Sequence, residues 1–502
     1  MLDWAAAKAA ATALAQGWQA QAGPGGAILL FDRDGIRASV GGGFASMTHR
    51  VAFTPDTPTR YASISKHILA VALLQAGLAL DRPLGSWLED LPAAIAAVPL
   101  GRALDMSGAL PDMMEVLWQQ GVPFTATLTC AEIGTVLRRL PGLNGAPGEE
   151  MAYSNTGWRL AQAVIERCSG QDYAQLVARL AGTVDPSIRF CADESQTVPG
   201  LATGYWQDGE IWRRGRYGFH FSASGGIAGS AAGLARWCMA LLAEDGPLAG
   251  LLPRLAAPRV FADGSDSAYR LGLVAARLGQ TALLGHGGSL PGYRNHMLLA
   301  PEAGVGVVLV SNREEDAHLP ALTVLAALLG ETLPQTAEDA PTGLFAEEAG
   351  PFWAELSPGT ISVMGGYERL VAAEGGGWRS LPAYLALHLR PGRDGALEGR
   401  IGGRARRLVP VAPDTPLDAR LTGSWRERGT GVVLTIRGDG GALMPWAGTI
   451  GRETRLTPLP GARALADLGH GPWRHRPCLW LRPDGALALA SHRARVHIFE
   501  RG

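Results

Sequence analysis

Apolar and polar positions in the first two thirds of the chain follow two different periods. Residues 27–31 are continuously apolar, residues 32–35 carry Asp and Gly, and residues 36–40 form a second strand-like run. This order predicts a β-hairpin, since Asp and Gly favour the tight turns that join antiparallel strands. Four later apolar runs between turns predict further strands of one sheet, at 271–274, 282–286, 293–299 and 305–310.

Longer runs, with apolar residues three or four positions apart, predict helices. Thr129 is expected to cap the helix that follows it. The last of these helices is expected to pack against the first and to complete a domain in which helices cover an antiparallel sheet. The predicted helices lie at 1–21, 67–77, 129–140, 157–168, 231–242 and 318–329.

The pattern changes after residue 330. Residues 331–342 are rich in Pro, Asp and Glu and predict an exposed linker. Beyond them, short apolar runs separated by Gly, Pro and Asp are typical of antiparallel all-β domains. Residues 389–397 and 481–487 share Leu-Arg-Pro followed by Asp-Gly-Ala-Leu. This echo indicates two related β-domains, although such turns also recur by coincidence in β-rich chains.

A chain of 502 residues is too long for a single hydrophobic core. The pattern therefore predicts an α+β fold in four segments. A domain with an antiparallel sheet and helices spans 1–330, and a linker spans 331–342. One small antiparallel β-barrel follows at 343–417 and a second at 418–502.

Composition and charge argue against several classes of partner. The chain is 47% hydrophobic and 18% charged with a formal net charge of -1, which gives no electrostatic reason to expect nucleic acid or an anionic membrane. The sequence shows neither a signal-peptide pattern nor an apolar run long enough to cross a membrane. The five cysteines lack metal-ligand or disulfide spacing, and the eleven histidines form no ligand motif. We therefore expect a cytoplasmic protein that uses neither a metal nor an organic cofactor.

One short stretch carries the candidate chemistry. Ser63 and Lys66 lie three residues apart at the start of an apolar helix, so one helical turn brings the lysine amine beside the serine hydroxyl. A serine hydroxyl needs an adjacent base to become a nucleophile, and a lysine whose pKa is lowered is such a base. Taken alone, the spacing equally fits a helix-capping serine followed by a solvated lysine.

Two further stretches follow in order, Tyr153-Ser154-Asn155 and His286-Gly287-Gly288. Together with the Ser63 stretch and the segment 107–112, which begins Ser-Gly and ends Leu-Pro-Asp, they resemble the motifs of the serine β-lactamase-like peptidase family. That family includes class C β-lactamases, DD-peptidases, D-aminopeptidases and related esterases. The resemblance covers residues 3–329 and implies a β-lactamase/transpeptidase-like catalytic domain that works through an acyl-enzyme.

The resemblance also implies a role for each residue. Ser63 would attack the acyl carbon, and Lys66 and Tyr153 would share the general acid–base work. Neighbouring cations would lower the pKa of Tyr153 so that it takes the serine proton. Asn155 would hydrogen-bond Lys66 or the substrate amide. The alternative for Tyr153, taken alone, is a buried tyrosine at a helix start.

The third motif separates the branches of this family. His286 stands where most β-lactamases have a lysine, and the resemblance associates His-x-Gly with D-aminopeptidases and several esterases. The alternative is a histidine packed at the end of a strand. Gly287 and Gly288 leave room for a substrate backbone beside the strand. By resemblance, the backbone N–H groups of Ser63 and Ser289 form the oxyanion hole.

The two C-terminal barrels favour one branch. Their layout resembles that of the D-aminopeptidases, in which a loop of the last barrel reaches the active site and limits it to substrates with a free N-terminal D-residue. The corresponding segment here is 464–472. Within it, Asp467 is a candidate partner for a substrate ammonium, and a solvated loop acid is the equally weighted alternative.

The resulting hypothesis is a serine hydrolase that releases N-terminal D-amino acids from small peptides, amino-acid amides or esters. A promiscuous esterase or a DD-peptidase on the same catalytic residues is the alternative. A non-catalytic penicillin-binding-like protein is a second alternative. The resemblance further implies a homodimer.

Overall fold

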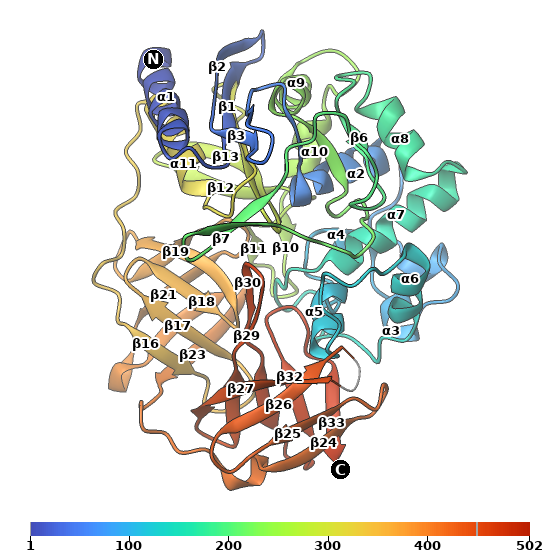
Figure 1. The fold of residues 1–502 in the computed structure, drawn as a ribbon, viewed down its shortest axis with the longest axis vertical. Coiled ribbons are helices and arrows are strands. Elements are labelled where there is room, and N and C mark those ends of the chain that lie inside the picture. The colour runs from blue at the N-terminus through green and yellow to red at the C-terminus, as the bar shows by residue number, and fades with distance from the viewer. Residues whose placement is uncertain (1, 448–449) are drawn as a thin grey trace.

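The sheet of the first domain is the centre of the fold. The computed structural model describes residues 2–447 and 450–502, which form this domain and two closed barrels arranged along the long axis of the molecule (Figure 1). The sheet is antiparallel and six-stranded. In sheet order its strands are β12 (Val274–Leu278), β13 (Thr281–Leu290), β14 (Tyr293–Ala300), β15 (Val305–Ser311), β1 (Gly26–Asp32) and β2 (Ile36–Gly42).

Helices cover both faces of this sheet, which explains why β1 is apolar from Ala27 to Phe31. Ile28 and Leu30 belong to a core shared with the first and last helices of the domain, whereas Leu29 and Phe31 belong to the larger core on the other face. The helices are α1 (Trp4–Ala20), α2 (Ser65–Gln75), α3 (Ala93–Ala96), α4 (Leu100–Leu104), α5 (Met113–Gln119), α6 (Cys130–Arg138), α7 (Asn155–Ser169), α8 (Tyr173–Leu180), α9 (Ala231–Leu242), α10 (Leu251–Ala256) and α11 (His318–Leu329).

Several elements were predicted correctly from local pattern. The bounds of α9 and α11 agree with the prediction, and α1 packs against α11, with the N–H of Asp3 donating to the carbonyl of Leu328 at 2.8 Å. Thr129 caps α6 in a capping box with Glu132. Each of these features depends on residues close together in the chain or on one amphipathic face, which is why sequence patterns reveal them.

The strand predicted at 271–274 is wrong, because β12 begins only at Val274. Gly272 has a φ of +75°, which ends any extended run there. A Cβ atom at this glycine would lie 2.7 Å from the backbone nitrogen of His67. The chain therefore turns at Gly272 in order to pass closely over α2, the helix that follows Ser63.

Short strands and single helical turns complete the first domain and the connections. Three of the short-strand pairs are β3 (Phe44–Ser46) with β4 (Val51–Ala52), β7 (Tyr205–Asp208) with β8 (Ile211–Arg214), and β10 (Arg259–Val260) with β11 (Asp266–Ser267). In a small three-stranded sheet, β9 (Ile227–Ser230) lies between β5 (Pro58–Arg60) and β6 (Arg189–Phe190). The 3₁₀ turns are η1 (Ala62–Ile64), η2 (Leu84–Ser86), η3 (Arg393–Gly395) and η4 (Ala419–Leu421).

The C-terminal region forms two closed eight-stranded antiparallel barrels, so the predicted α+β fold class is confirmed. The first consists of β16 (Gly343–Ala346), β17 (Trp353–Ser357), β18 (Thr360–Val363), β19 (Gly366–Ala372), β20 (Trp378–Leu381), β21 (Leu387–Pro391), β22 (Leu397–Ile401) and β23 (Arg404–Pro410). The second consists of β24 (Gly423–Glu427), β25 (Val433–Ile436), β26 (Gly441–Trp446), β27 (Ile450–Leu459), β28 (Arg463–Ala466), β31 (Cys478–Leu481), β32 (Leu487–Ala490) and β33 (His497–Arg501).

The repeated Leu-Arg-Pro pattern marks the same hairpin in both barrels. It covers the turn between β21 and β22 in the first barrel and the turn between β31 and β32 in the second. In the strand order of each barrel these are the sixth and seventh strands. A shared motif at a shared structural position favours related barrels over coincidence.

The segment 331–342 is largely exposed or half-buried, apart from the buried Ala337 and Ala340. Ala337 is fully buried, its N–H donates to the carbonyl of Leu370 at 3.1 Å, and its carbonyl accepts from the N–H of Gly359 at 3.2 Å. The segment therefore packs along the first barrel. Its backbone hydrogen bonds to that barrel, which composition does not reveal, hold it in place.

Ion pairs and hydrogen bonds hold the three parts together around the catalytic domain. Glu150 of that domain accepts from Arg406 of the first barrel at 2.5 Å and also from Arg495 of the second. Arg463 of the second barrel donates to the carbonyls of Glu347 and Gly350, which connects the two barrels. Contacts to buried acceptors of this kind fix the barrels relative to the domain.

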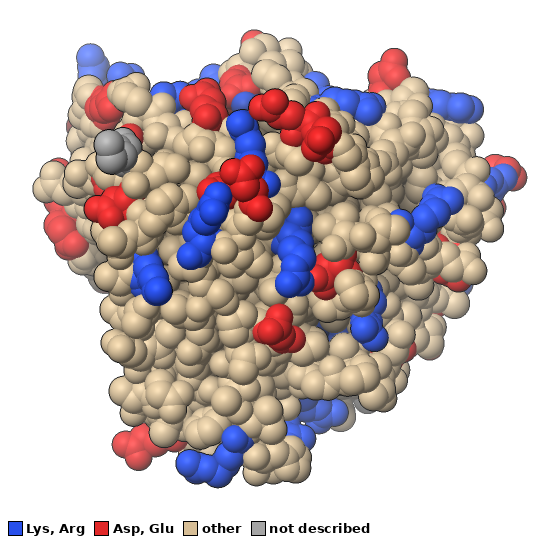
Figure 2. All heavy atoms as spheres, turned by 90° about the horizontal axis from the view of Figure 1, so that it is seen from above, with Lys and Arg blue, Asp and Glu red and all other residues tan. Residues whose placement is uncertain are grey.

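The surface carries both signs of charge. On the face drawn in Figure 2, Lys and Arg side chains lie intermixed with Asp and Glu, in keeping with the net charge of -1. Within residues 2–447 and 450–502, no helix has the length and apolar character needed to cross a membrane.

Candidate active site

Ser63 lies in η1, the single 3₁₀ turn directly before α2. The residue before it, Ala62, is fully buried and has a φ of +53°, a left-handed conformation that costs energy for a residue with a Cβ. Packing imposes this conformation, because Tyr61 is also fully buried and its hydroxyl donates to the carbonyl of Ser230 at 2.6 Å. The strained turn presents Ser63 to the cavity described below.

Lys66 is fully buried on the first turn of α2. Its Nζ lies 3.0 Å from Ser63 Oγ, 2.9 Å from Asn155 Oδ1 and 2.7 Å from the carbonyl oxygen of Ser224. Burial lowers the pKa of this amine well below its usual value, and the positive charge of Arg493 adds to the effect. A neutral amine donates its two hydrogens to the acceptors Asn155 Oδ1 and Ser224 O, which leaves its lone pair for the Ser63 proton.

Tyr153 stands between the amine of Lys66 and the guanidinium of Arg493. Lys66 Nζ lies 5.0 Å from the centroid of its ring and the Arg493 guanidinium carbon lies 4.9 Å from it. Burial nevertheless raises the pKa of Tyr153 to about 12, while its hydrogen bond with Ser63 and the charge of Arg493 oppose that rise. The expected lowering of this pKa is therefore wrong in direction. A neutral Tyr153 donates its hydroxyl proton, and Lys66 is the better base.

His286 is buried on β13 and is neutral. Its Nδ1 lies 2.6 Å from the carbonyl oxygen of Gly287, so this nitrogen carries the proton, and its Nε2 accepts from the hydroxyl of Tyr269 at 2.8 Å. Burial lowers the pKa of His286 to about 3. The histidine thus does not replace the positive charge of the lysine that most β-lactamases carry at this place.

Gly287, Gly288 and Ser289 form the edge of β13 that faces Ser63. A Cβ atom at Gly288 would lie 2.1 Å from the carbonyl oxygen of Tyr61, so only glycine lets this strand approach the nucleophile turn so closely. The partner strand β12 pairs with β13 only as far as Gly285. The next residues of β13 therefore have an edge that β12 does not cover, beside which a substrate backbone has room to lie. Ser289 is exposed in the same cavity.

Asp112 connects the second motif to the C-terminal barrel. It is fully buried and caps α5. Its Oδ2 accepts from the N–H of Asn155 at 2.7 Å and from Arg493 Nη2 at 2.9 Å. The carboxylate thereby holds Asn155, which in turn holds Lys66.

The two barrels both contribute to the site. Tyr384 of the first barrel lies edge-on to Tyr153 with ring centroids 5.2 Å apart. Its segment is held by the buried Glu368, which accepts the N–H groups of Ala383, Tyr384 and Leu385 at 2.7–3.0 Å. Pro472, Trp473 and Arg474 of the second barrel belong to the hairpin β29 (Leu468–His470)–β30 (Trp473–His475), which extends from that barrel toward the catalytic domain (Figure 1).

These groups surround one cavity of about 520 Å³, a volume suited to a small ligand. The cavity contains all of the predicted site residues except Lys66, which lies behind Ser63, and Asp467. It is lined by Ser63, Met114, Glu115, Trp118, Tyr153, Asn155, His286, Gly287, Gly288, Ser289, Arg294, Asn295, His296, Asp316, Ala317, His318, Gly365, Gly366, Tyr367, Ala383, Tyr384, Pro472, Trp473, Arg474 and Arg493.

Asp467 lies outside this cavity. It is exposed, its carbonyl accepts from Thr454 and its carboxylate accepts from Arg474 at 3.5 Å. The acid that does line the cavity beside the catalytic residues is Glu115 of α5, which sequence reasoning missed. A lone acid between Met114 and Val116 in an apolar helix was a usable signal, since unpaired acids are seldom buried.

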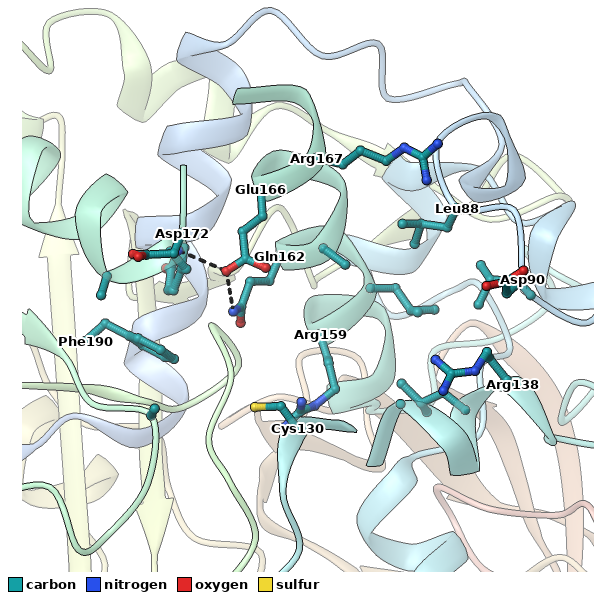
Figure 3. A pocket seen from close by; sticks show the side chains of 18 of the residues that line it. Leu88, Asp90, Cys130, Arg138, Arg159, Gln162, Glu166, Arg167, Asp172 and Phe190 are labelled. Carbon is teal, nitrogen blue, oxygen red and sulfur yellow. Dashed lines mark hydrogen bonds between the residues drawn. The ribbon is translucent and has the colours of Figure 1, made fainter. Parts of the chain in front are cut away.

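A second cavity, of about 710 Å³, lies on the helical side of the domain between α6, α7 and α8 (Figure 3). Several of its polar groups already bind one another or the backbone. Glu166 accepts from Gln162 at 3.0 Å and from the N–H of Tyr173 at 2.9 Å, and Arg159 donates to the carbonyl of His220 at 2.6 Å. The described residues that line it include no serine, lysine or histidine. The chemistry therefore belongs to the Ser63 cavity.

Comparisons with known sequences agree on the first domain. The family model described as beta-lactamase matches residues 10–331. The D-aminopeptidase of Gluconobacter oxydans (strain 621H) is 26% identical over 331 residues, which cover 64% of this chain and 62% of that protein. The D-aminopeptidase of Brucella canis is 28% identical over 324 residues, which cover 61% of this chain and 60% of that protein. The match thus spans less than two thirds of each relative.

Solved structures extend the likeness to the barrels at the level of the fold. The octameric penicillin-binding protein homologue from Pyrococcus abyssi has a TM-score of 0.58 at 17% identity, covering 97% of this chain and 99% of that one. The D-amino acid amidase from Ochrobactrum anthropi SV3, solved with L-phenylalanine amide, has a TM-score of 0.54 at 23% identity, covering 64% of this chain and 99% of that one.

Proposed function

The chain belongs to the beta-lactamase family, and from this premise we propose that it is a serine hydrolase that releases N-terminal D-amino acids from amides, esters or small peptides. The observation that carries the proposal is the buried amine of Lys66, 3.0 Å from the hydroxyl of Ser63 in a cavity of small-ligand size. The D-configuration rests on the likeness to D-aminopeptidases.

The catalytic cycle follows from the protonation states of the site. Lys66 takes the Ser63 proton as Oγ bonds to the acyl carbon, and the backbone N–H groups of Ser63 and Ser289 stabilise the oxyanion. The neutral Tyr153 gives its proton to the leaving nitrogen as the C–N bond breaks, and the proton that Lys66 took from Ser63 then restores the tyrosine, which leaves Lys66 neutral again. Water then attacks the acyl-enzyme, with Lys66 again as the base, and frees the amino acid.

Glu115 supports a preference for substrates with a free amine. Its carboxyl group lines the same cavity as Ser63, accepts a hydrogen bond from Ser491 and forms a long ion pair with Arg493 Nε at 3.9 Å. The other cavity acid, Asp316, is already bound by two nitrogens of Arg369 at 2.8 and 3.0 Å. A substrate ammonium therefore finds Glu115 as its partner, because a desolvated ammonium needs a nearby carboxylate.

Replacing Glu115 by glutamine is expected to raise the KM for D-alanine amide about 10- to 100-fold, since one charge-assisted hydrogen bond is worth about 1.5–3 kcal/mol. Burial raises the pKa of Glu115 to about 7, so the wild-type carboxyl is neutral below that pH. Binding of a cationic substrate is therefore expected to improve as pH rises through 7. Steady-state kinetics from pH 5 to pH 9 check whether Glu115→Gln abolishes this fall in KM with rising pH.

An uncharged acyl substrate provides the control. Ser63-dependent cleavage of p-nitrophenyl acetate has no ammonium to bind, so Glu115→Gln should leave its KM within about twofold of wild type. An equal rise in KM for both substrates would show that the glutamine variant disturbs the cavity rather than an ammonium site.

The proposal is tested with three p-nitroanilides, of D-alanine, L-alanine and N-acetyl-D-alanine. We expect cleavage of the D-alanine substrate at a kcat/KM about 100-fold or more above the other two, because a site built around a paired ammonium rejects analogues that leave its acid unpaired. Comparable cleavage of the N-acetyl substrate would favour the esterase or DD-peptidase alternative. Absence of Ser63 labelling by a fluorophosphonate would favour the non-catalytic alternative.

A homodimer and a cytoplasmic location belong to the same proposal. The homodimer follows from family resemblance alone, and one structural relative is described as octameric. Light scattering of the purified protein at several concentrations distinguishes a dimer from larger assemblies or a monomer.

A further inference from the structure

A loop of the second barrel enters the catalytic centre. It connects β32 to β33 and spans 491–496. The carbonyl of Arg493 in this loop accepts the N–H of Asp112 at 2.8 Å and Asn144 Nδ2 at 3.0 Å, and Asn144 Oδ1 accepts the N–H of Arg495 at 2.9 Å. Backbone hydrogen bonds in both directions therefore fix this loop against the catalytic domain.

The guanidinium of Arg493 is held over the ring of Tyr153. Its Nη2 donates to Asp112 Oδ2 at 2.9 Å and its Nε donates to the carbonyl of Tyr153 at 3.2 Å, while its carbon lies 4.9 Å from the ring centroid. Only 23% of the side-chain surface is exposed. The cation is thus built into the same cavity as Ser63 although it is more than 400 residues away in the chain.

We propose that Arg493 is a positioning residue of the catalytic centre, which keeps the Lys66 amine uncharged and thereby makes activation of Ser63 depend on the docked second barrel. The inference rests on the proposed role of Lys66 as the base. It assigns to Arg493 the positive charge that the neutral His286 does not supply. The loop of the second barrel would then act on the charge of Lys66 as well as on the shape of the cavity.

The distances are short enough for this effect. Lys66 Nζ and the Arg493 guanidinium carbon lie 5.0 and 4.9 Å from the same ring centroid, so they are at most about 10 Å apart. At an effective dielectric of about 20, one positive charge at about 10 Å shifts the pKa of a neighbouring amine by about one unit. Asp112 already acts on Lys66 in the opposite direction, so removing Arg493 leaves that upward effect on the pKa unopposed.

The other titratable groups that face this site do not cancel the effect. The sheet side presents His286, whose pKa burial lowers, and Tyr269, whose pKa burial raises, so both are neutral near pH 7. The first barrel presents Tyr384, whose pKa burial also raises. From α5, Glu115 becomes charged only near pH 7 and above. His67 on α2 is neutral because burial lowers its pKa to about 4. Arg493 and Asp112 are therefore the permanent charges beside Lys66.

The composition of the chain makes the pKa of the Lys66 amine measurable. Among the 45 Lys and Arg residues, the lysines are Lys8 and Lys66, and Lys8 is exposed on α1. NMR of protein labelled with ¹³C in lysine alone therefore follows the titration of Lys66 directly, with Lys8 as an internal reference. In the wild type, Lys66 should titrate well below Lys8.

We expect Arg493→Gln to raise the pKa of Lys66 by about one unit or more and to leave that of Lys8 unchanged. Arg493→Lys, which keeps the charge, should restore most of the wild-type value. Arg495→Gln is the matched control, because Arg495 lies in the same loop as Arg493. Its replacement removes an ion pair with Glu150 but changes no charge beside Lys66. It should leave the titration of Lys66 unchanged even if it lowers the melting temperature.

A chemical readout separates this inference from the proposed function. The rate of Ser63 labelling by a fluorophosphonate depends on pH through the Lys66 base. In Arg493→Gln, the midpoint of this pH dependence should move to higher pH, by as many pH units as the Lys66 titration moves in the NMR experiment. An unchanged Lys66 titration in a folded Arg493→Gln variant would overturn the inference. Failure of wild-type Ser63 to label, with the NMR shift still present, would instead overturn the hydrolase proposal.

Discussion

Replacing Ser63 by alanine is expected to reduce kcat/KM for D-alanine p-nitroanilide by at least about 10⁴-fold, since losing the nucleophile removes the acyl-enzyme route altogether. Alanine fits the turn without strain, as the Ser63 hydroxyl serves only Lys66 and Tyr153. The melting temperature should therefore change little. Steady-state rates and thermal unfolding of the same preparation measure both quantities.

Ser65→Ala is the matched control for this variant. Ser65 lies two residues away, is fully buried, and its hydroxyl accepts the N–H of Ile227 at 3.1 Å. Its removal should cost about 1 kcal/mol of stability while most of the activity remains. An active Ser63→Ala variant, or an inactive but folded Ser65→Ala variant, would place the nucleophile elsewhere.

Replacing Lys66 by arginine is expected to lower kcat/KM by about 10³-fold or more, because a guanidinium does not give up its proton and so provides no base. Because the position is fully buried, the permanent charge is also expected to lower the free energy of unfolding. Lys8→Arg, at an exposed position, should change neither quantity. Steady-state kinetics and denaturant unfolding at pH 7 test both variants, Lys66→Arg and Lys8→Arg.

Lys66→Met separates loss of the base from loss of the fold. The wild-type protein holds this amine neutral, whereas the unfolded chain protonates it up to a pH of about 10.4. The lowered pKa therefore makes the native state less stable as pH falls, and the wild-type free energy of unfolding should rise between pH 7 and pH 9 because of this group. Lys66→Met should lack this rise and be inactive at both pH values. If the stability of Lys66→Met rises between pH 7 and pH 9 as much as that of the wild type, Lys66 is charged in the native state.

Sequence reasoning found parts of the site by two routes, local spacing in the chain and resemblance to family motifs. Ser63 and Lys66 meet because one helical turn separates them, and the glycines at 287 and 288 follow from the need for close approach to a strand edge. Tyr153 and Asn155 were found through the family motif, and the structure brings Asn155 to 2.9 Å from Lys66.

The parts that were missed depend on tertiary packing. Arg493 has no local feature that marks it, and only the closure of the second barrel brings it to Asp112. For the same reason Asp467 was a candidate ammonium partner and Glu115 was missed, since a position on a loop that reaches the cavity does not tell which side chain faces it. The pKa of Tyr153 was misjudged because neighbouring charges were considered and burial was not.

The most direct test of the central claim is to trap the acyl-enzyme. Protein mixed with D-alanine p-nitroanilide and quenched in acid within the first turnovers is digested and analysed by mass spectrometry. We predict a D-alanyl adduct on the peptide that contains Ser63, absent in Ser63→Ala and absent with the L-enantiomer. Turnover of the D-substrate without any adduct on that peptide, or an adduct on another residue, would contradict the account.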